Sequence, residues 1–322
     1  VGSEMCIRDS NRIKKTYKKS NKKYWTSKMN ILGFIGGSGI YKLEFLTDIK
    51  EHKIKSSFGD PSGPIIEGKI DNNTVYFLSR HGEGHTLSPS SINYCANIDC
   101  LKQVGVTDLI SLSAVGSLKD NLKPGTFVIV DQFIDRTINR KKSFFDKGIV
   151  AHVPMAHPTC EVLMNLSKNI CENIKINYSF GGTYLAMEGP QFSTYAESNL
   201  YIDWGCDVIG MTNMPEAKLA REAEIRYCSI SMVTDYDCWH PDHDKVDLSM
   251  IIKTLNDNVD NSKNFIKNFS SKYYEGISFE NDKTSNILDT SIITKKEFWD
   301  KDLENNLSNI LKRYKKNSDV SK

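Results

Sequence analysis

The sequence feature that most constrains the fold is an apolar, β-prone run, Tyr227–Val233, that ends abruptly in polar and acidic residues. Thr234, Asp235 and Asp237 follow it, so a buried strand here delivers two carboxylates at its C-terminal end. Open α/β sheets bind their ligands outside the carboxyl ends of the strands. Two acids one residue apart can address adjacent atoms of one polar heterocycle. The stretch also fits a plain strand followed by an acidic turn, so its meaning depends on the rest of the chain.

Strand-like and helix-like segments alternate along the chain, and most of the strand-like segments end in Gly, Ser, Thr or a charged residue. We expect strands at Ile31–Ile35, Thr107–Ser113 and Gly182–Met187, and amphipathic helices at Glu161–Ile176 and Asp247–Phe269. This alternation is typical of an open α/β sheet with one cleft along one rim. The predicted fold class is therefore α/β, with a doubly wound mixed β-sheet flanked by helices.

The chain divides into three regions by composition. Residues 1–28 hold nine Lys and Arg against two acids, lack the apolar core of a secretory signal, and resemble translated cloning sequence. We expect this leader to be non-native or disordered, with the natural start at Met29. Residues 29–270 are expected to form one catalytic domain, and residues 271–322 a polar, partly helical extension. Within the domain, the irregular segment from Asp135 to Pro158 is long enough to be functional.

Composition excludes several classes of protein. No apolar run approaches the roughly 18–20 residues that a membrane span needs. The chain beyond the leader is mildly acidic, which argues against a nucleic-acid partner. None of the eight cysteines forms a CxxC pair, as expected for reduced thiols in a cytoplasmic protein. The best metal candidate is His240–Asp244, but Pro241 breaks any helical face there, so we expect a solvated loop and no metal.

Two segments that follow strands have the chemistry of anion binding. Gly36–Gly39 allows backbone amides to converge on an anion, and Ser38 adds a hydroxyl. The turn matches neither a dinucleotide fingerprint nor a P-loop, so we expect a phosphate-like anion rather than a nucleotide pyrophosphate. Arg80 and His81 follow another strand, and arginine suits bidentate recognition of an oxyanion. Arg80–Glu83 also resembles the histidine phosphatase motif, in which His81 would be the nucleophile.

Six motifs occur in the order and spacing of the trimeric purine nucleoside phosphorylases, and the chain resembles that family from Ile31 to Phe269. Within the family it is most similar to the methylthioadenosine phosphorylase branch. Each motif alone is weak, whereas six in register form a specific pattern. The motifs are Gly36–Gly39, Arg80–Gly82, Ser113–Gly116, Met187–Phe192, Gly210–Asn213 and Thr234–Asp237.

The resemblance implies that phosphate cleaves 5′-methylthioadenosine into adenine and 5-methylthioribose 1-phosphate. It also implies a homotrimer, with phosphate as co-substrate and no cofactor. The phosphate ligands implied in this way are Ser38, Arg80, His81, Ser113, the Ala114 amide and Thr212. Other members carry Thr at the first and fourth of these positions, and Ser retains the hydroxyl.

For the base, the resemblance implies that Asp235 donates a proton to N7 and that Asp237 accepts a hydrogen bond from the exocyclic amine. An Asp that is protonated at neutral pH needs a raised pKa, which burial beside a second carboxylate can provide. We therefore predict a proton shared by Asp235 and Asp237.

The remaining substrate contacts concern the purine, the ribose and the 5′ group. Ser193 stands where the 6-oxopurine branch has Glu, and Asp235 where that branch has Asn, which favours adenine. Phe192 is expected against the purine or sugar and Met211 behind the ribose, with core packing as the alternative for both. The implied 5′ contacts are Leu248, Ile251 and, from a neighbouring subunit, His152. Alternative functions are a phosphorylase of 6-oxopurine nucleosides or methylthioinosine, and a nucleoside-binding module without turnover.

Overall fold

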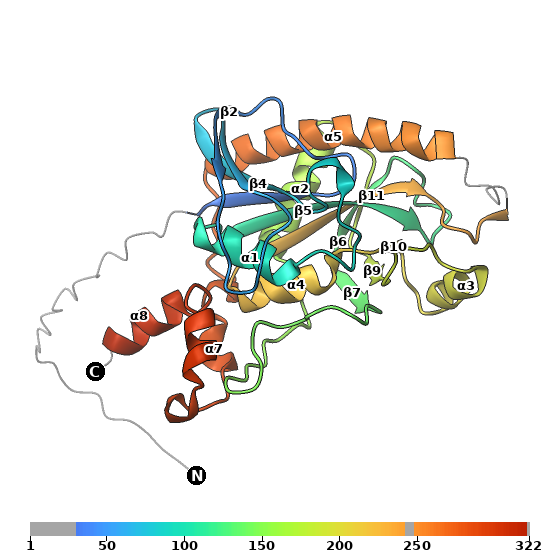
Figure 1. Cartoon of the computed structure of the whole chain (residues 1–322). Helices are drawn as coiled ribbons and strands as arrows, with labels where there is room; N and C mark the ends of the chain where they lie inside the picture. The colour runs from blue at the N-terminus through green and yellow to red at the C-terminus, as the bar shows by residue number, and fades with distance from the viewer. Residues whose placement is uncertain (1–29, 242–247, 321–322) are drawn as a thin grey trace, which may run out of the picture.

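The computed structural model describes residues 30–241 and 248–320, so the expected leader at residues 1–28 lies outside the described residues. One twisted sheet runs through the middle of the molecule, with α5 across one face and α1 and α4 on the other (Figure 1). Helix α2 packs against α5 on the first face. Within the described residues no helix is both long and apolar enough to cross a membrane.

The sheet is mixed, and its central strands are parallel. The strand order is β2-β3-β4-β1-β5-β10-β9-β7, while β11 pairs with β5 and β6, and β8 pairs with β6. The four neighbouring strands β4, β1, β5 and β11 are parallel to one another. Strand β10 runs antiparallel to β5, and β6 runs antiparallel to β11. The strands are β1 (Leu32–Gly36), β2 (Thr47–His52), β3 (Ile65–Ile70), β4 (Asn73–Ser79), β5 (Asp108–Ser117), β6 (Phe127–Val130), β7 (Gln132–Asp135), β8 (Tyr178–Phe180), β9 (Thr183–Ala186), β10 (Val208–Gly210) and β11 (Arg226–Asp235).

The predicted fold class is confirmed, and the expected strands and helices fall within a few residues of the observed ones. Short 3-10 turns lie at Glu83–His85, Thr284–Asn286 and Lys296–Phe298. The helices are α1 (Tyr94–Gln103), α2 (Glu161–Asn173), α3 (Tyr195–Asp203), α4 (Asn213–Glu222), α5 (Leu248–Tyr274), α6 (Leu288–Ser291), α7 (Lys301–Asn306) and α8 (Lys312–Val320).

Alternation along the central strands divides the apolar side chains between two cores. On β5, Leu109 joins the core under α1 and α4, whereas Ile110 and Leu112 join the core under α2 and α5. All three side chains are completely buried, as expected when helices cover both faces of a sheet. This double cover leaves the strand ends as the place where polar groups can reach a ligand.

Strand β11 contains one irregularity close to its C-terminal end. Its parallel register with β5 is regular up to Val233, which pairs with Val115, and then shifts so that Asp235 pairs with Gly116. Thr234 is therefore an extra residue in β11 relative to β5, the arrangement of a β-bulge.

The C-terminal region packs onto the sheet domain. Leu288, Leu307 and Ile310 are fully buried and join the core under α1 and α4. Ile292 forms an isolated antiparallel bridge with Ala151, so this region also holds the irregular segment that follows β7. In Figure 1, α7 and α8 lie below the sheet, beside that segment.

Candidate active site

A cavity of about 570 Å³ opens where the central strands end. Parallel pairing brings the C-terminal ends of β4, β1, β5 and β11 to the same edge of the sheet, so residues far apart in sequence meet there. The lining residues are Gly37, Ser38, Arg80, His81, His85, Thr86, Ser88, Pro89, Ser113, Ala114, Val115, Gly116, Met187, Pro190, Phe192, Ile209, Gly210, Met211, Thr212, Thr234, Asp235, Asp237 and Leu255. All six predicted phosphate ligands and both predicted catalytic carboxylates are among them.

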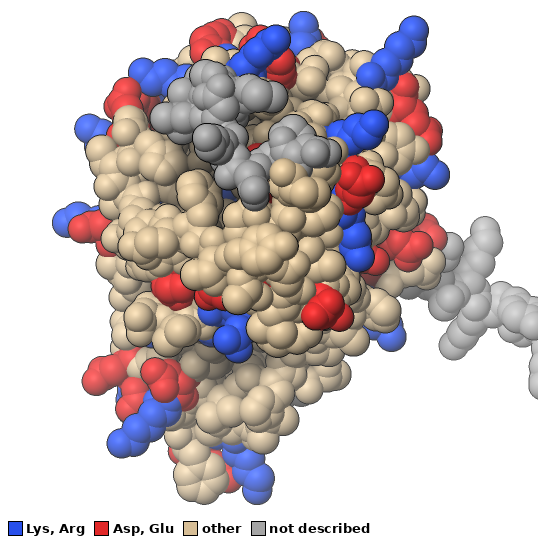
Figure 2. Space-filling view, turned by 90° about the vertical axis from the view of Figure 1, so that its right-hand side faces the viewer, with Lys and Arg blue, Asp and Glu red and all other residues tan. Residues whose placement is uncertain are grey.

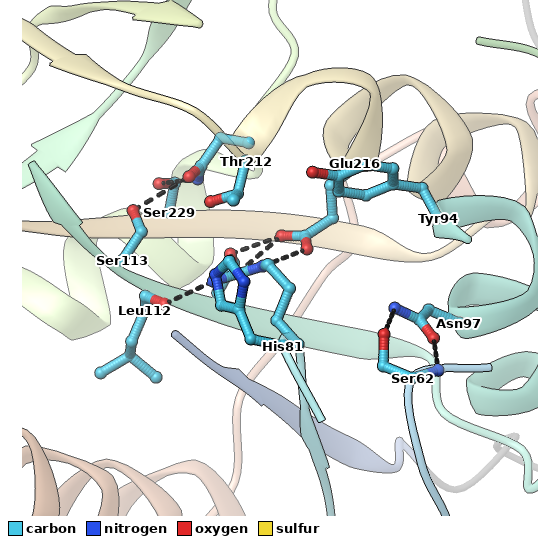
Figure 3. Close-up of polar contacts among 12 residues, drawn as sticks. Ser62, His81, Tyr94, Asn97, Leu112, Ser113, Thr212, Glu216 and Ser229 are labelled. Atoms are coloured by element: carbon cyan, nitrogen blue, oxygen red, sulfur yellow. Dashed lines mark hydrogen bonds and ion pairs between the residues drawn. The ribbon is translucent and has the colours of Figure 1, made fainter. Parts of the chain in front are cut away.

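Arg80 lies completely buried beneath the cavity and is paired with a carboxylate that the sequence did not reveal. Its Nε lies 2.8 Å from Glu216 Oε2, and its Nη2 donates to Glu216 Oε1 at 3.1 Å. Nη2 also donates to Ser111 Oγ and Nη1 to the Leu112 carbonyl (Figure 3). Burial works to lower the pKa of Arg80, but the Glu216 carboxylate outweighs it and raises that pKa above its ordinary value. The positive charge of Arg80 is therefore already balanced by Glu216 in the absence of a ligand.

His81 is fixed from two sides. Its Nδ1 lies 2.9 Å from the Leu87 carbonyl oxygen, which can only accept, so Nδ1 carries the proton. Its ring stacks on His85 with centroids 4.1 Å apart, and His85 in turn contacts the Tyr41 hydroxyl at 3.0 Å. Burial lowers the pKa of His81 to about 4, and the nearby Arg80 acts in the same direction. At neutral pH His81 is therefore an uncharged imidazole whose Nε2 accepts hydrogen bonds.

The end of the cavity that contains Arg80 and His81 is called the anion end, and small residues around it pack against backbone atoms. A Cβ on Gly37 would lie 2.7 Å from the Leu112 carbonyl oxygen and 2.9 Å from Arg80 Nη1, so only glycine fits this close approach. Ser113 donates to Asn213 Oδ1 at 2.9 Å, and the Thr212 amide donates to the Tyr184 hydroxyl at 3.3 Å. These contacts fix the hydroxyl-bearing residues before any ligand is present.

The carboxyl groups of Asp235 and Asp237 occupy the other end of the cavity, called the base end. Asp235 accepts hydrogen bonds from the Thr234 hydroxyl at 2.7 Å and from the Asp237 amide at 2.8 Å, and Asp237 accepts one from Ser198 at 2.7 Å. Burial raises the pKa of Asp235. Burial and then the charge of Asp235 raise the pKa of Asp237, while the hydroxyls of Ser198 and Ser193 act in the opposite direction. Each carboxyl has its own hydroxyl donor, and the shared proton stays a prediction.

The predicted base and ribose contacts differ in exposure. Phe192 is 79% exposed at the cavity, which rules out the alternative that it is a core residue. Met211 lines the cavity and packs on Gly189, where a Cβ would collide with its sulfur. Ser193 is buried beside Met187 Sδ, 3.7 Å away, rather than in the cavity wall. In Figure 2 an uncharged band crosses the face turned to the viewer, with a group of charged side chains directly below it and others around the edge.

The expected 5′ contacts have a mixed outcome. Leu248 and Ile251 begin α5, but their side chains lie outside the described part of the chain. Leu255, about one turn further on, lines the cavity. His152 is exposed on the segment held by the C-terminal region, where its amide donates to the Ser291 carbonyl, and it does not line the cavity of its own chain.

The candidate metal cluster after Trp239 falls mostly outside the described residues, which stop at Pro241 and resume at Leu248. Across the two described ranges, no three His, Cys, Asp or Glu side chains are grouped to hold a metal ion.

Sequence reasoning missed Glu216, Ser198 and His85. Glu216 had one usable signal: a buried arginine at a strand end requires an acid, and Glu216 lies on the helix that begins at the last residue of the Gly210–Asn213 motif. Ser198, in the middle of α3, and His85, at the end of a 3-10 turn, carried no signal of their own.

The fold and the site define the class of protein, and the comparisons agree: the chain belongs to the phosphorylase superfamily, whose family model matches residues 31–271. It is 54% identical over 264 residues to the S-methyl-5′-thioadenosine phosphorylase of Rhodospirillum rubrum, covering 82% of this chain and 90% of that protein. It is 53% identical over 276 residues to the enzyme of the same name from Bradyrhizobium diazoefficiens, covering 85% and 94%. The family resemblance predicted from the motifs is confirmed.

Solved structures give the same assignment. A methylthioadenosine phosphorylase from an antarctic soil metagenomic library superposes with a TM-score of 0.80 at 42% identity, covering 88% of this chain and 99% of that one. The methylthioadenosine phosphorylase of Schistosoma mansoni, solved in complex with adenine, superposes with a TM-score of 0.75 at 29% identity, covering 88% and 98%.

Proposed function

We propose that this chain catalyses the phosphorolysis of S-methyl-5′-thioadenosine to adenine and 5-methylthioribose 1-phosphate. The observation that carries the proposal is a single cavity with oxyanion donors at one end and two buried carboxyls at the other. The register of β5 and β11 sets the scale: Ser113 pairs with Ser231, and Gly116 pairs with Asp235. Three residues of strand span roughly 10 Å, which suits one nucleoside with a phosphate beneath its sugar.

The chemistry follows from this spacing. Phosphate is bound by Arg80 and by the hydroxyls of Ser113 and Thr212, and it attacks C1′. At the same time the bond from C1′ to N9 breaks, and its electron pair moves into the base. A protonated Asp235 gives its proton to N7, and Asp237 accepts the hydrogen bond of the exocyclic amine. Holding two reactants in place supplies up to ~7–11 kcal/mol of the barrier. General acid help adds about 3–5 kcal/mol, or ~10²–10⁴-fold in rate.

The preference for an adenine base rests on the carboxyl pair. An amine donates to carboxylates, whereas the oxygen of a 6-oxopurine would face them as a second acceptor. Leu255 supplies an apolar contact for a 5′-methylthio group, although one such contact discriminates by only ~1–3 kcal/mol.

The deciding experiment supplies methylthioadenosine with and without inorganic phosphate and measures adenine by chromatography. Adenine release that requires phosphate supports the proposal, whereas release without phosphate indicates hydrolysis and overturns it. Rates on adenosine, inosine and methylthioinosine are measured in parallel. A faster rate on the hypoxanthine nucleosides would move the assignment to the 6-oxopurine branch.

We further propose a cytoplasmic homotrimer that serves purine and methionine salvage and needs no cofactor. The seven described cysteines are free, in keeping with a reducing compartment. Phe192, Tyr195, Leu200 and Trp204 are exposed apolar residues around α3, as expected of a surface that another subunit covers. Sedimentation equilibrium, compared with the 36.5 kDa chain, tests the subunit count.

The placement of His152 in a neighbouring site is tested by mixing two weakened variants, His152→Ala and Asp235→Asn. Hybrid trimers would contain sites with both wild-type residues, so activity should recover on mixing. If His152 acts within its own chain, mixing restores nothing.

A further inference from the structure

The irregular segment after β7 sends one arginine into the protein behind the cavity. Arg140 comes from a stretch without regular secondary structure, yet its side chain is only 1% exposed. A cation this deeply buried needs several acceptors, because an unpaired buried charge is strongly destabilising.

Most of its acceptors are backbone carbonyls. Nη1 donates to the carbonyls of Met211 at 2.5 Å and Met214 at 2.9 Å. Nη2 donates to the Glu188 carbonyl at 2.6 Å, and Nε lies 3.4 Å from Glu188 Oε1. Nη1 also lies 3.1 Å from the Tyr94 hydroxyl, which in turn donates to the Pro89 carbonyl at 2.9 Å.

These acceptors belong to three segments that form the cavity wall. Pro89, Met187, Pro190, Met211 and Thr212 all line the cavity. The segments of Glu188 and Met211 also touch each other directly, because the Met211 sulfur packs where a side chain on Gly189 would be. Arg140 therefore holds both sides of the contact that sets the position of Met211.

We propose that Arg140 is a positioning residue for the nucleoside end of the cavity. It does not line the cavity; it acts by fixing the Met187–Pro190 and Met211–Thr212 segments at one separation. The inference rests on the proposed function, since it concerns the ribose and base of the same substrate. Without the guanidinium, three carbonyls lose a charged donor and the two segments separate. A displacement of about 1 Å at a site of this kind costs ~10²-fold in rate.

The anion end depends on Arg140 much less. Its donors Ser38, Arg80 and Ser113 follow β1 and β4 or lie within β5, and Arg80 is held by Glu216. Thr212 lies in a segment that Arg140 binds, and Ser113 donates to Asn213 in the same stretch, whereas Ser38 and Arg80 follow strands on the other side of β5. Loss of Arg140 should therefore affect the nucleoside more than phosphate, a split that general destabilisation would not produce.

The test compares wild type with Arg140→Ala and Arg140→Lys, with rates expressed per folded molecule. Both variants should lose ~10²-fold in kcat/KM for methylthioadenosine, while KM for phosphate stays within about threefold. Lysine retains the charge but has no planar fork, so it should not restore the geometry. Guanidinium chloride at low millimolar concentration should restore part of the activity of Arg140→Ala, and equal sodium chloride should not.

Arg221→Ala is the matched control. Arg221 is a less deeply buried arginine that also donates to a carbonyl, that of His157, but it lies at the far end of α4 from the cavity. It should leave both KM values unchanged. The inference is overturned if Arg140→Ala and Arg140→Lys change only the free energy of unfolding, or raise both KM values by the same factor.

Failure of the proposed function gives a different result. Wild type would then release no adenine with phosphate, and adenine binding measured by calorimetry takes the place of turnover. Weaker adenine binding by both Arg140 variants, with normal binding by Arg221→Ala, would still support a positioning role. Equal adenine binding by all four proteins would overturn it.

Discussion

The two ends of the cavity bury charge in opposite ways. At the anion end, Arg80 is matched by Glu216 at 2.8 Å, and His81 is kept neutral by burial. At the base end, the hydrogen bonds of Asp235 and Asp237 come from hydroxyls and an amide, and burial raises the pKa of both carboxyls. The charges of the first end are therefore balanced and its role is to hold the geometry, whereas the second end retains two carboxyls whose pKa values are raised, which favours their protonated forms.

The largest expected effect comes from removing the exchangeable proton. Asp235→Asn keeps the size of the side chain but cannot protonate N7, so kcat/KM for methylthioadenosine should fall by ~10²–10⁴-fold. Asp131→Asn is the control, since Asp131 also accepts a backbone amide, that of Gly182, outside the cavity wall. Turnover of Asp235→Asn within a few-fold of wild type would show that Asp235 is not the acid.

Breaking the ion pair at the anion end should act on stability first. Glu216→Gln leaves the Arg80 charge buried without its partner, which should lower the free energy of unfolding by about 3–5 kcal/mol in urea titrations. Phosphate can replace the missing negative charge, so it should raise the melting temperature of this variant more than that of wild type.

Glu222→Gln provides the contrast for this experiment. Glu222 is equally buried, but burial raises its pKa to about 7, so it is partly neutral already and its replacement should cost less. Equal losses for the two variants would show that Glu216 is not special as the partner of Arg80.

The pH dependence of stability separates the two ends by sign. The pKa of His81 falls from 6.5 to about 4 on folding, so its contribution is complete above pH 6.5 and is lost as the pH falls towards 4. The loss should reach about 3 kcal/mol. His81→Gln should lack this slope in urea titrations between pH 7 and 4.

For Asp235 the sign is reversed. Its pKa is raised on folding, so its contribution is present below the ordinary carboxyl pKa and is lost as the pH rises. Asp235→Asn should gain stability relative to wild type between pH 4 and 7. A parallel pH profile for the two proteins would refute the raised pKa.

The smallest effect on activity is expected from Ser198, which hydrogen-bonds to Asp237 at the base end. Ser198→Ala removes a donor to Asp237, so the pKa of that carboxyl should rise further and its ionised form should become rarer. KM for methylthioadenosine should rise several-fold, corresponding to about 1 kcal/mol. Ser167→Ala, a buried serine that donates to the Leu163 carbonyl away from the cavity, is the control. If both variants behave alike, the Ser198 contact has no role in binding.

The sequence predicted the parts of the site that follow strands. Asp235 and Arg80 could be identified because parallel strands bring their carboxyl ends to one edge, so a motif at a strand end has a defined place. Thr212 follows β10, which runs antiparallel to β5, and its place was indicated by the family motif alone. The partners of these residues on helices could not be identified. Glu216 is 136 residues from Arg80, and which side of α4 faces the sheet is decided by packing.

The same limit applies away from the strands. Arg140 lies in a segment without helical or strand periodicity, so the sequence did not indicate which way its side chain points. Leu255 lies about one turn beyond the predicted Ile251, whose side chain lies outside the described residues, so the Ile251 prediction stays open. His152 lies outside the cavity of its own chain, and the hypothesis that a neighbouring subunit receives it stays open to the mixing experiment.

The bulge at Thr234 also has a consequence for how base preference can change over evolutionary time. Because the extra residue Thr234 reorients the end of β11, the direction of the Asp235 side chain does not depend on how the rest of the sheet packs. Substitutions at the two acid positions can then exchange one purine for another while the hydrophobic layers beneath stay as they are. A lineage can in this way acquire a new nucleoside without rebuilding its scaffold.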